Sequence, residues 1–296
     1  MTRLTQDADF RTFNLPPGLL PLGYDQVISD DTFNDGYNGW QDHSERNGSA
    51  TSWNPPIGLS QQRTFNGSRH SLKLSTGTST TANAAYGGSC SAYKRGARTH
   101  ETGFLLLLQW IAYRGTAEQA APRSIHMGID TQKIDNSSRM FPKLILQRWV
   151  GSGPDVFAPK YSIIDDSSNS VDIPGAAAAS ETSPTAGSGV VFGWNENKAG
   201  FFPQALVVSL DANGGVGAYH RALLGGKWFD LTGLAAGRGA QSPQLTTGGG
   251  GTSYAGGQNI GNSIFNRTAT ADGPAALFIG RSTLLHYPAG TEFPTS

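Results

Sequence analysis

Short apolar runs, broken by Gly, Asn, Ser and Pro, recur along almost the whole chain and predict β-strands rather than helices. Asn-Gly dipeptides at 47–48, 66–67 and 213–214 favour tight turns between such strands. The segment after Gly225-Gly226 is typical of the return strand of a small hairpin. We expect strands near residues 27–33, 38–44, 59–65, 70–76, 103–113, 123–130, 140–150, 159–165, 190–195, 204–211, 215–221, 226–231 and 275–282.

Two of these runs differ from simple alternation. Residues 103–113 are apolar on both faces, whereas a strand with one wet face would alternate. We therefore expect this strand to be central and covered on both sides. Residues 140–150 are similar, but Lys143, Gln147 and Arg148 interrupt the pattern, so the second face of that strand is expected to be partly polar.

The two ends of the pattern favour one closed domain. A strand signal at 27–36, closing with Gly39-Trp40, stands near the start, and another stands at 275–282. First and last strands that pair as neighbours are how a single antiparallel sandwich closes. The expected fold class is all-β, an antiparallel two-sheet jelly-roll sandwich over residues 25–296. Gly/Ser-rich loops are expected at about 166–189 and 237–274, because such segments bury little apolar surface.

Residues 1–24 are predicted to form an extended N-terminal docking arm. The run Leu15–Leu22 combines Pro and Leu. Proline prevents a helix here, and the leucines are too numerous for a solvated tail. The arm is expected to pack along its own domain or to dock on a neighbouring subunit, with a free tail as the remaining alternative.

Composition then excludes several classes of function. Lys plus Arg equals Asp plus Glu at 22 each, and no basic stripe is visible, so a nucleic-acid partner is not expected. No apolar run approaches the ~20 residues of a membrane helix, and no signal peptide is recognisable, so we expect synthesis in the cytoplasm without membrane insertion. The single Cys90 cannot form an internal disulfide.

Hard oxygen ligands gather in one short segment. Asp30, Asp31, Asn34 and Asp35 lie within six residues, and calcium accepts such ligands. The spacing does not match an EF-hand, because Phe33 stands where a ligand is needed. A structural calcium site is one interpretation, and turn capping by these side chains is the other. No other cofactor is expected.

Aromatic and planar polar side chains suggest a second kind of site. Tyr113, His126, Gln147 and Trp149 lie on alternating faces of three predicted strands. If those faces coincide, they form a shallow platform suited to a sugar ring. The alternative is an ordinary second core layer beneath a loop, since large aromatics are usually packing residues.

No arrangement of residues indicates catalysis. A nucleophile elbow and a phosphate-binding loop are missing, and the six histidines lack metal-ligand spacing. Glycoside hydrolysis requires two facing carboxylates. No strand carries a paired-carboxylate pattern, and Glu101, Asp130 and Asp211 lie only at predicted strand edges. We therefore expect a protein that is not an enzyme.

The chain resembles a concanavalin A-like, laminin-G-like jelly-roll domain. The likeness is carried by Ser29–Gly36 with Gly39-Trp40, by Phe65–Leu74 and by Leu277–Arg281. The resemblance implies a relative of lectins, glucanases and adhesive modules. The strand motif that carries the catalytic carboxylates of the glucanases is missing, which argues against hydrolysis.

In overall style the chain also resembles minor tail or baseplate proteins of bacteriophages. The shared traits are an apolar arm at the initiator Met, a Gly/Ser/Thr/Asn-rich sandwich and few charges. This resemblance implies a virion structural protein that assembles as a homo-oligomer, a trimer among the candidates. It would contact other tail subunits and host surface glycans during host attachment. The alternatives are a stand-alone bacterial carbohydrate-binding lectin and a glycoside hydrolase-like enzyme.

Overall fold

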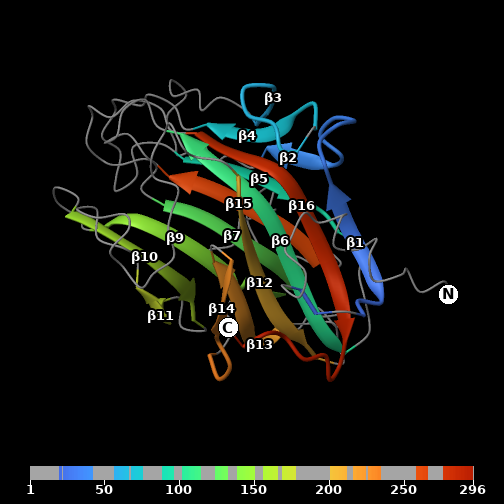
Figure 1. The fold of residues 1–296 in the computed structure, drawn as a ribbon, viewed down its shortest axis with the longest axis vertical. Coiled ribbons are helices and arrows are strands. Elements are labelled where there is room, and N and C mark those ends of the chain that lie inside the picture. Colours follow the sequence, from blue (N-terminus) through green and yellow to red (C-terminus); the bar gives the residue numbers. More distant parts are fainter. Residues whose placement is uncertain are drawn as a thin grey trace, which may run out of the picture.

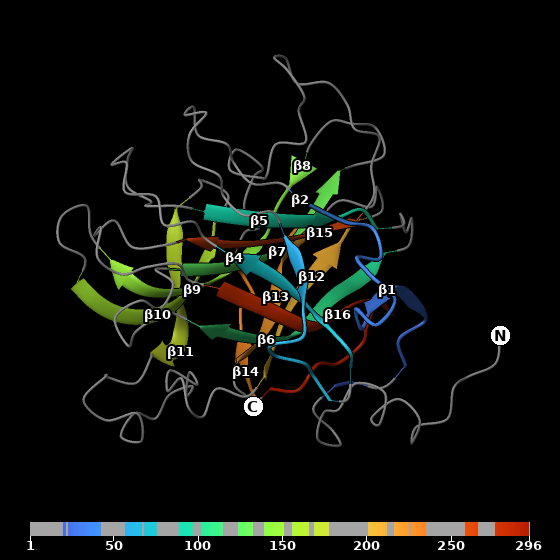
Figure 2. The ribbon, with the colours of Figure 1, turned by 90° about the horizontal axis from the view of Figure 1, so that it is seen from above.

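The computed structural model places the chain in two packed β-sheets, and Figures 1 and 2 show these as two layers. It describes residues 20–21, 23–42, 57–66, 68–75, 89–96, 102–114, 124–132, 139–150, 156–165, 169–177, 201–211, 216–224, 226–234, 258–265 and 276–295. Within these ranges there are strands and turns but no helix, and hence none long and apolar enough to span a membrane.

The first sheet, sheet A, has eight strands in the order β14-β13-β12-β6-β16-β4-β3, with β1 also paired to β16. Every pairing in it is antiparallel. Its strands are β1 (Gln26–Asp31), β3 (Gly58–Ser60), β4 (Ser71–Ser75), β6 (Gly103–Arg114), β12 (Phe202–Leu210), β13 (Val216–Leu224), β14 (Lys227–Asp230) and β16 (Ala276–Pro288).

The second sheet, sheet B, also has eight antiparallel strands, in the order β11-β10-β9-β7-β15-β5-β2, with β8 paired to β7. Its strands are β2 (Trp40–Asp42), β5 (Ser89–Lys94), β7 (Ser124–Gln132), β8 (Arg139–Met140), β9 (Lys143–Val150), β10 (Val156–Ile164), β11 (Ser170–Ala177) and β15 (Gln258–Phe265). The fold class, an all-β antiparallel two-sheet jelly-roll sandwich, is confirmed.

The first and last strands pair as the sequence predicts. Gln26 lies opposite His286 and Asp31 opposite Ser282, so β1 extends the edge of β16 beyond the point where β4 ends. The prediction of a strand covered on both faces is confirmed for β6, which lies between β12 and β16. Leu105 and Leu107 face the interior between the sheets, whereas Leu106 and Leu108 belong to a second apolar cluster on the outer face of sheet A.

That second cluster includes the end of the predicted arm. Leu20 is buried against it, and Pro21 accepts a hydrogen bond from the Tyr287 hydroxyl at 3.3 Å. Phe293, from the segment after β16, covers the same cluster and packs edge-on to Tyr287. Residues 20–21 therefore pack along their own domain, and residues 1–19 lie outside the described part of the chain.

Three strands were not expected. The predicted loop at 237–274 contains β15, a central strand of sheet B, and the predicted loop at 166–189 contains all of β11. The loop prediction was wrong for those residues, and β5 was not predicted at all. The strand expected at 190–195 lies outside the described residues.

The composition of β15 explains the error, because its interior positions are partly polar. Asn262 faces the interior and is fully paired there, exchanging two hydrogen bonds of 2.8 Å with Gln109 of sheet A. The Gln109 amide also donates to Ser282 Oγ at 3.0 Å. A buried amide costs little when every polar atom is bonded, but that bonding is not visible in a sequence pattern.

Candidate functional site

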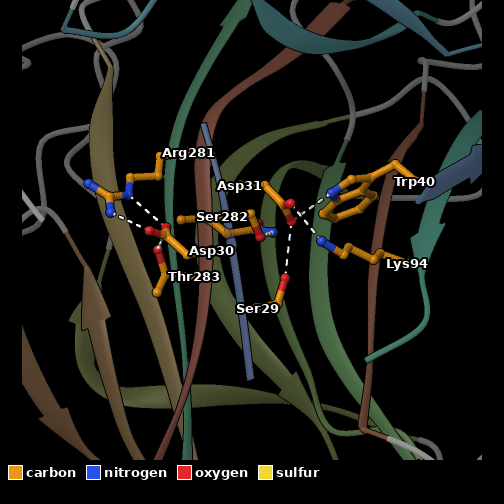
Figure 3. Close-up of polar contacts among 9 residues, drawn as sticks. Ser29, Asp30, Asp31, Trp40, Lys94, Arg281, Ser282 and Thr283 are labelled. Atoms are coloured by element: carbon orange, nitrogen blue, oxygen red, sulfur yellow. Dashed lines mark hydrogen bonds and ion pairs between the residues drawn. The ribbon is translucent and has the colours of Figure 1, made fainter. Parts of the chain in front are cut away.

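The predicted calcium residues lie on β1 and in the loop after it, and the two carboxylates on β1 each have a cationic partner. Figure 3 shows Asp30 and Asp31 pointing to opposite sides of the strand, as successive strand residues do. Asp30 accepts hydrogen bonds from Arg281 Nε at 2.9 Å, from the second Arg281 nitrogen at 2.6 Å and from Thr283 Oγ1 at 2.8 Å. This fork-to-fork pairing fastens the outer side of β1 to β16.

Asp31 points into the sandwich and joins the two sheets. Its carboxylate accepts from Lys94 Nζ at 2.6 Å, from Trp40 Nε1 at 3.1 Å and from Ser29 Oγ at 3.1 Å. Lys94 and Trp40 lie on β5 and β2 of sheet B, whereas Asp31 lies on sheet A. Asp31 is only 2 % exposed, so each of its bonds replaces water that the carboxylate has lost.

The four predicted calcium ligands are therefore not brought to one point. Asn34 uses its side-chain oxygen to accept a 2.7 Å hydrogen bond from the Arg69 backbone N–H, and Asp35 is exposed. No group of three or more His, Cys, Asp or Glu side chains within the described ranges is placed to hold a metal ion. Asp30 and Asp31 bond to side chains of other strands, and Asn34 bonds to a backbone N–H 35 residues away, so these contacts are not the local turn capping given above as the alternative.

The predicted sugar platform is divided between the sheets. Tyr113 lies on β6 of sheet A, is 5 % exposed and belongs to the interior core, with its ring edge-on to Phe202. His126, Gln147 and Trp149 lie on β7 and β9 of sheet B. The structure does not place Tyr113 on the same surface as the other three.

The remaining three share one sheet. Ser124 of β7 lies opposite Gln147, and His126 lies opposite Ile145, so backbone alternation puts positions 145, 147 and 149 on the same face as His126. This is the outer face, because the alternating residues Ile125, Met127, Leu144 and Leu146 fill the interior. The side chains of Gln147 and Trp149 lie outside the described part of the structure.

The outer face of sheet B also carries two residues that the sequence did not single out. Ser263 of β15 lies directly opposite His126, and the Phe265 ring centroid lies 4.6 Å from that of His126. His126 Nε2 is 3.2 Å from Ser124 Oγ, and Ser263 Oγ is 2.8 Å from Ser91 Oγ. We call His126, Ser263 and Phe265, all partly exposed, the β7–β15 patch.

The β7–β15 patch is electrically neutral at ordinary pH. Burial of most of the imidazole, with the charge of nearby Lys143, lowers the pKa of His126 to about 3. Lys143 itself is 7 % exposed, and its ammonium group lies 4.7 Å from the centre of the Phe141 ring. The patch therefore presents an aromatic ring, a neutral imidazole and hydroxyl groups, which together suit a polar but uncharged ligand.

The carboxylates considered for catalysis are separated by the fold. Asp130 lies on β7 of sheet B, whereas Asp211 directly follows β12 of sheet A. Glu101 lies outside the described residues. The described part of the chain thus gives no facing pair of these carboxylates on one strand or one sheet.

Comparison with known proteins gives similarity of fold only. No family model matches the chain, and no curated protein sequence matches it. The Emp47p carbohydrate recognition domain is 12 % identical, with a TM-score of 0.42 over 90 % of this chain and 97 % of that one. Peanut lectin is 10 % identical, with a TM-score of 0.40 over 88 % and 97 % of the two chains. An endo-1,3-beta-glucanase from Streptomyces sioyaensis is 11 % identical, with a TM-score of 0.40 over 92 % and 98 %.

Proposed function

We propose that this protein is a non-enzymatic carbohydrate-binding β-sandwich that binds an uncharged sugar on the outer face of sheet B. The observation that carries the proposal is the β7–β15 patch, where the Phe265 ring, a neutral His126 and the Ser263 hydroxyl lie side by side. Sugars present an apolar C–H face and a rim of hydroxyl groups, which match an aromatic ring flanked by neutral donors and acceptors.

The positions of Gln147 and Trp149 support the same surface. Gln147 of β9 lies directly opposite Ser124 of β7, and Trp149 follows two residues later on the same face of β9. We propose that both extend the β7–β15 patch towards β10. A carbohydrate-binding role is also the lectin alternative that the resemblance suggests.

Binding to a panel of neutral oligosaccharides, measured by glycan array and then by calorimetry, tests the proposal. We expect Phe265→Ala and Trp149→Ala each to weaken binding about tenfold, since an aromatic–sugar contact of about 1.4 kcal/mol corresponds to that factor. Lys227→Ala is the control, because Lys227 is exposed on β14 of the other sheet. Binding that is equally strong in all four proteins would refute the site, and release of reducing sugar would contradict a non-enzymatic role.

A location on a bacteriophage tail tip or baseplate is a separate proposal that depends on the sequence traits alone. In that setting the sugar would be a host surface glycan, and residues 1–19 would join sister subunits or other virion proteins. The protein would be made in the host cytoplasm and carried on the particle.

A further inference from the structure

A second exposed surface lies at the loop of residues 32–39, which connects β1 of sheet A to β2 of sheet B and is drawn in blue beside β3 in Figure 1. We call it the β1–β2 loop. Tyr37 in this loop is 42 % exposed, and among the described residues it is one of two large apolar side chains that are exposed. Asn34, Asp35 and Asn38 are exposed around it.

The β1–β2 loop is fixed at both ends by buried aromatic rings. Phe33 is fully buried and Trp40 is 4 % exposed, both belong to the interior core, and their ring centroids lie 6.2 Å apart. Removing either ring from the core would leave a cavity and destabilise the fold strongly. The loop is therefore anchored in the core at both ends.

Three hydrogen bonds hold the part between these anchors. The Trp40 N–H donates to the Tyr37 carbonyl at 2.8 Å, and the Tyr37 hydroxyl donates to the Ile57 carbonyl at 3.3 Å. Asn34 Oδ1 accepts from the Arg69 N–H, as described above. The Tyr37 ring is thus tethered at its tip while much of its surface stays in water.

The backbone of the β1–β2 loop adopts costly conformations. Phe33 has a φ of 58° and Asn38 a φ of 48°, two of the three positive values found for non-glycine residues among those described. Such conformations are strained for residues other than glycine and tend to gather at functional sites, where the surroundings enforce them. Tyr37 and Asn38 are both exposed in this loop.

We propose that the β1–β2 loop is a second sugar-contacting site, in which the Tyr37 ring packs against the C–H face of a neutral hexose. The amide of Asn38 and the carboxylate of Asp35 supply the directional hydrogen bonds that the hydroxyl groups of a sugar require. A single rigid ring is too small an area for a stable protein partner, which needs about 800 Å² on each side. The Asp35 carboxylate disfavours anionic ligands such as nucleic acid.

This inference rests on the proposed carbohydrate binding, and its test separates the two. The probes are methyl α-mannoside, methyl β-galactoside, N-acetylglucosamine and cellotetraose. Saturation-transfer NMR detects the binding of each probe, and titration gives its dissociation constant. The proteins are the unaltered chain, Tyr37→Ala, Tyr37→Phe, Phe265→Ala and Val27→Ala. Val27 is the matched control, since it is an exposed apolar side chain, 45 % accessible, outside the loop.

We expect Tyr37→Ala to weaken binding of at least one probe about tenfold, while Tyr37→Phe and Val27→Ala leave it within about twofold. Full binding by Tyr37→Ala, with loss only in Phe265→Ala, would overturn the loop site and leave the proposed function intact. An equal loss in Val27→Ala would also overturn it. Absence of binding by the unaltered chain would overturn both proposals.

Discussion

His126 illustrates how the surroundings of one residue determine its chemistry. The imidazole is packed against Phe265 and lies near the Lys143 ammonium, so the protonated form is disfavoured in the folded state. It is therefore a neutral donor and acceptor throughout the physiological range. Sugar binding at the β7–β15 patch should accordingly be constant between about pH 5 and 8, unlike binding by a histidine with an ordinary pKa.

The same property predicts a pH dependence of stability. The folded pKa of about 3 lies below the ordinary value of 6.5, so between these limits the unfolded chain binds more protons. Stability is then lost as the pH falls from about 6.5, by at most about 1.4 kcal/mol per unit. Urea unfolding of the unaltered chain and of His126→Asn is measured at each pH from 7 to 4. The difference between their free energies of unfolding should shrink as the pH falls. If the two free energies instead change in parallel with pH, the burial of the imidazole is contradicted.

Alternation of side chains along a strand predicts which residues share a face of that strand, but not which sheet the strand joins. Alternation within a strand put His126 on the same face as Ser124, but it could not tell that β6 joins the other sheet, where Tyr113 turns inward. Ser263 and Phe265 were missed because their strand contains Gly261 and Asn262, residues typical of loops. The pairing partner of Asn262, Gln109, lies 153 positions away in the sequence, and no local pattern records it.

Among the elements, β1 depends most on individual polar contacts. Among the described strands it pairs only with β16, and it is fastened there by the Arg281 fork on Asp30 and inside by Lys94 on Asp31. The prediction that the two terminal strands pair came from their apolar pattern and was correct. The carboxylates beside them were interpreted as calcium ligands because sequence alone does not show which cation faces a carboxylate.

Removing the charge of Asp31 should destabilise this element strongly. Asp31→Asn leaves the Lys94 ammonium, 14 % exposed, without its carboxylate, and breaking a buried pair from one side costs about 3 kcal/mol or more. We expect a lower urea midpoint with an unchanged slope. The control Asp35→Asn alters an exposed side chain four residues away and should change stability by less than about 0.5 kcal/mol; equal effects of the two changes would contradict the role of Asp31.

At the scale of the whole molecule, the predicted arm has two parts: residues 1–19, and the part from Leu20 onward that packs on sheet A. Leu20 and Tyr24 pack on the outer cluster of sheet A, so a chain that begins at residue 20 keeps the contacts described here. If residues 1–19 join sister subunits, their deletion should convert an oligomer into a monomer without lowering the thermal midpoint. Light scattering coupled to size-exclusion chromatography, together with a thermal melt, measures both; a full-length monomer would argue against the subunit contact.

The position of β16 determines when sheet A can finish folding during synthesis. Residues 276–288 lie in the middle of sheet A, between β6 on one side and β4 with β1 on the other. During synthesis, every strand that β16 joins is made long before it and must wait with an unpaired edge. Sheet A can form fully only after residue 288 has left the ribosome, so we expect this protein to fold late in its synthesis. Until then the unpaired edges of its strands are exposed, and chaperones are expected to protect them.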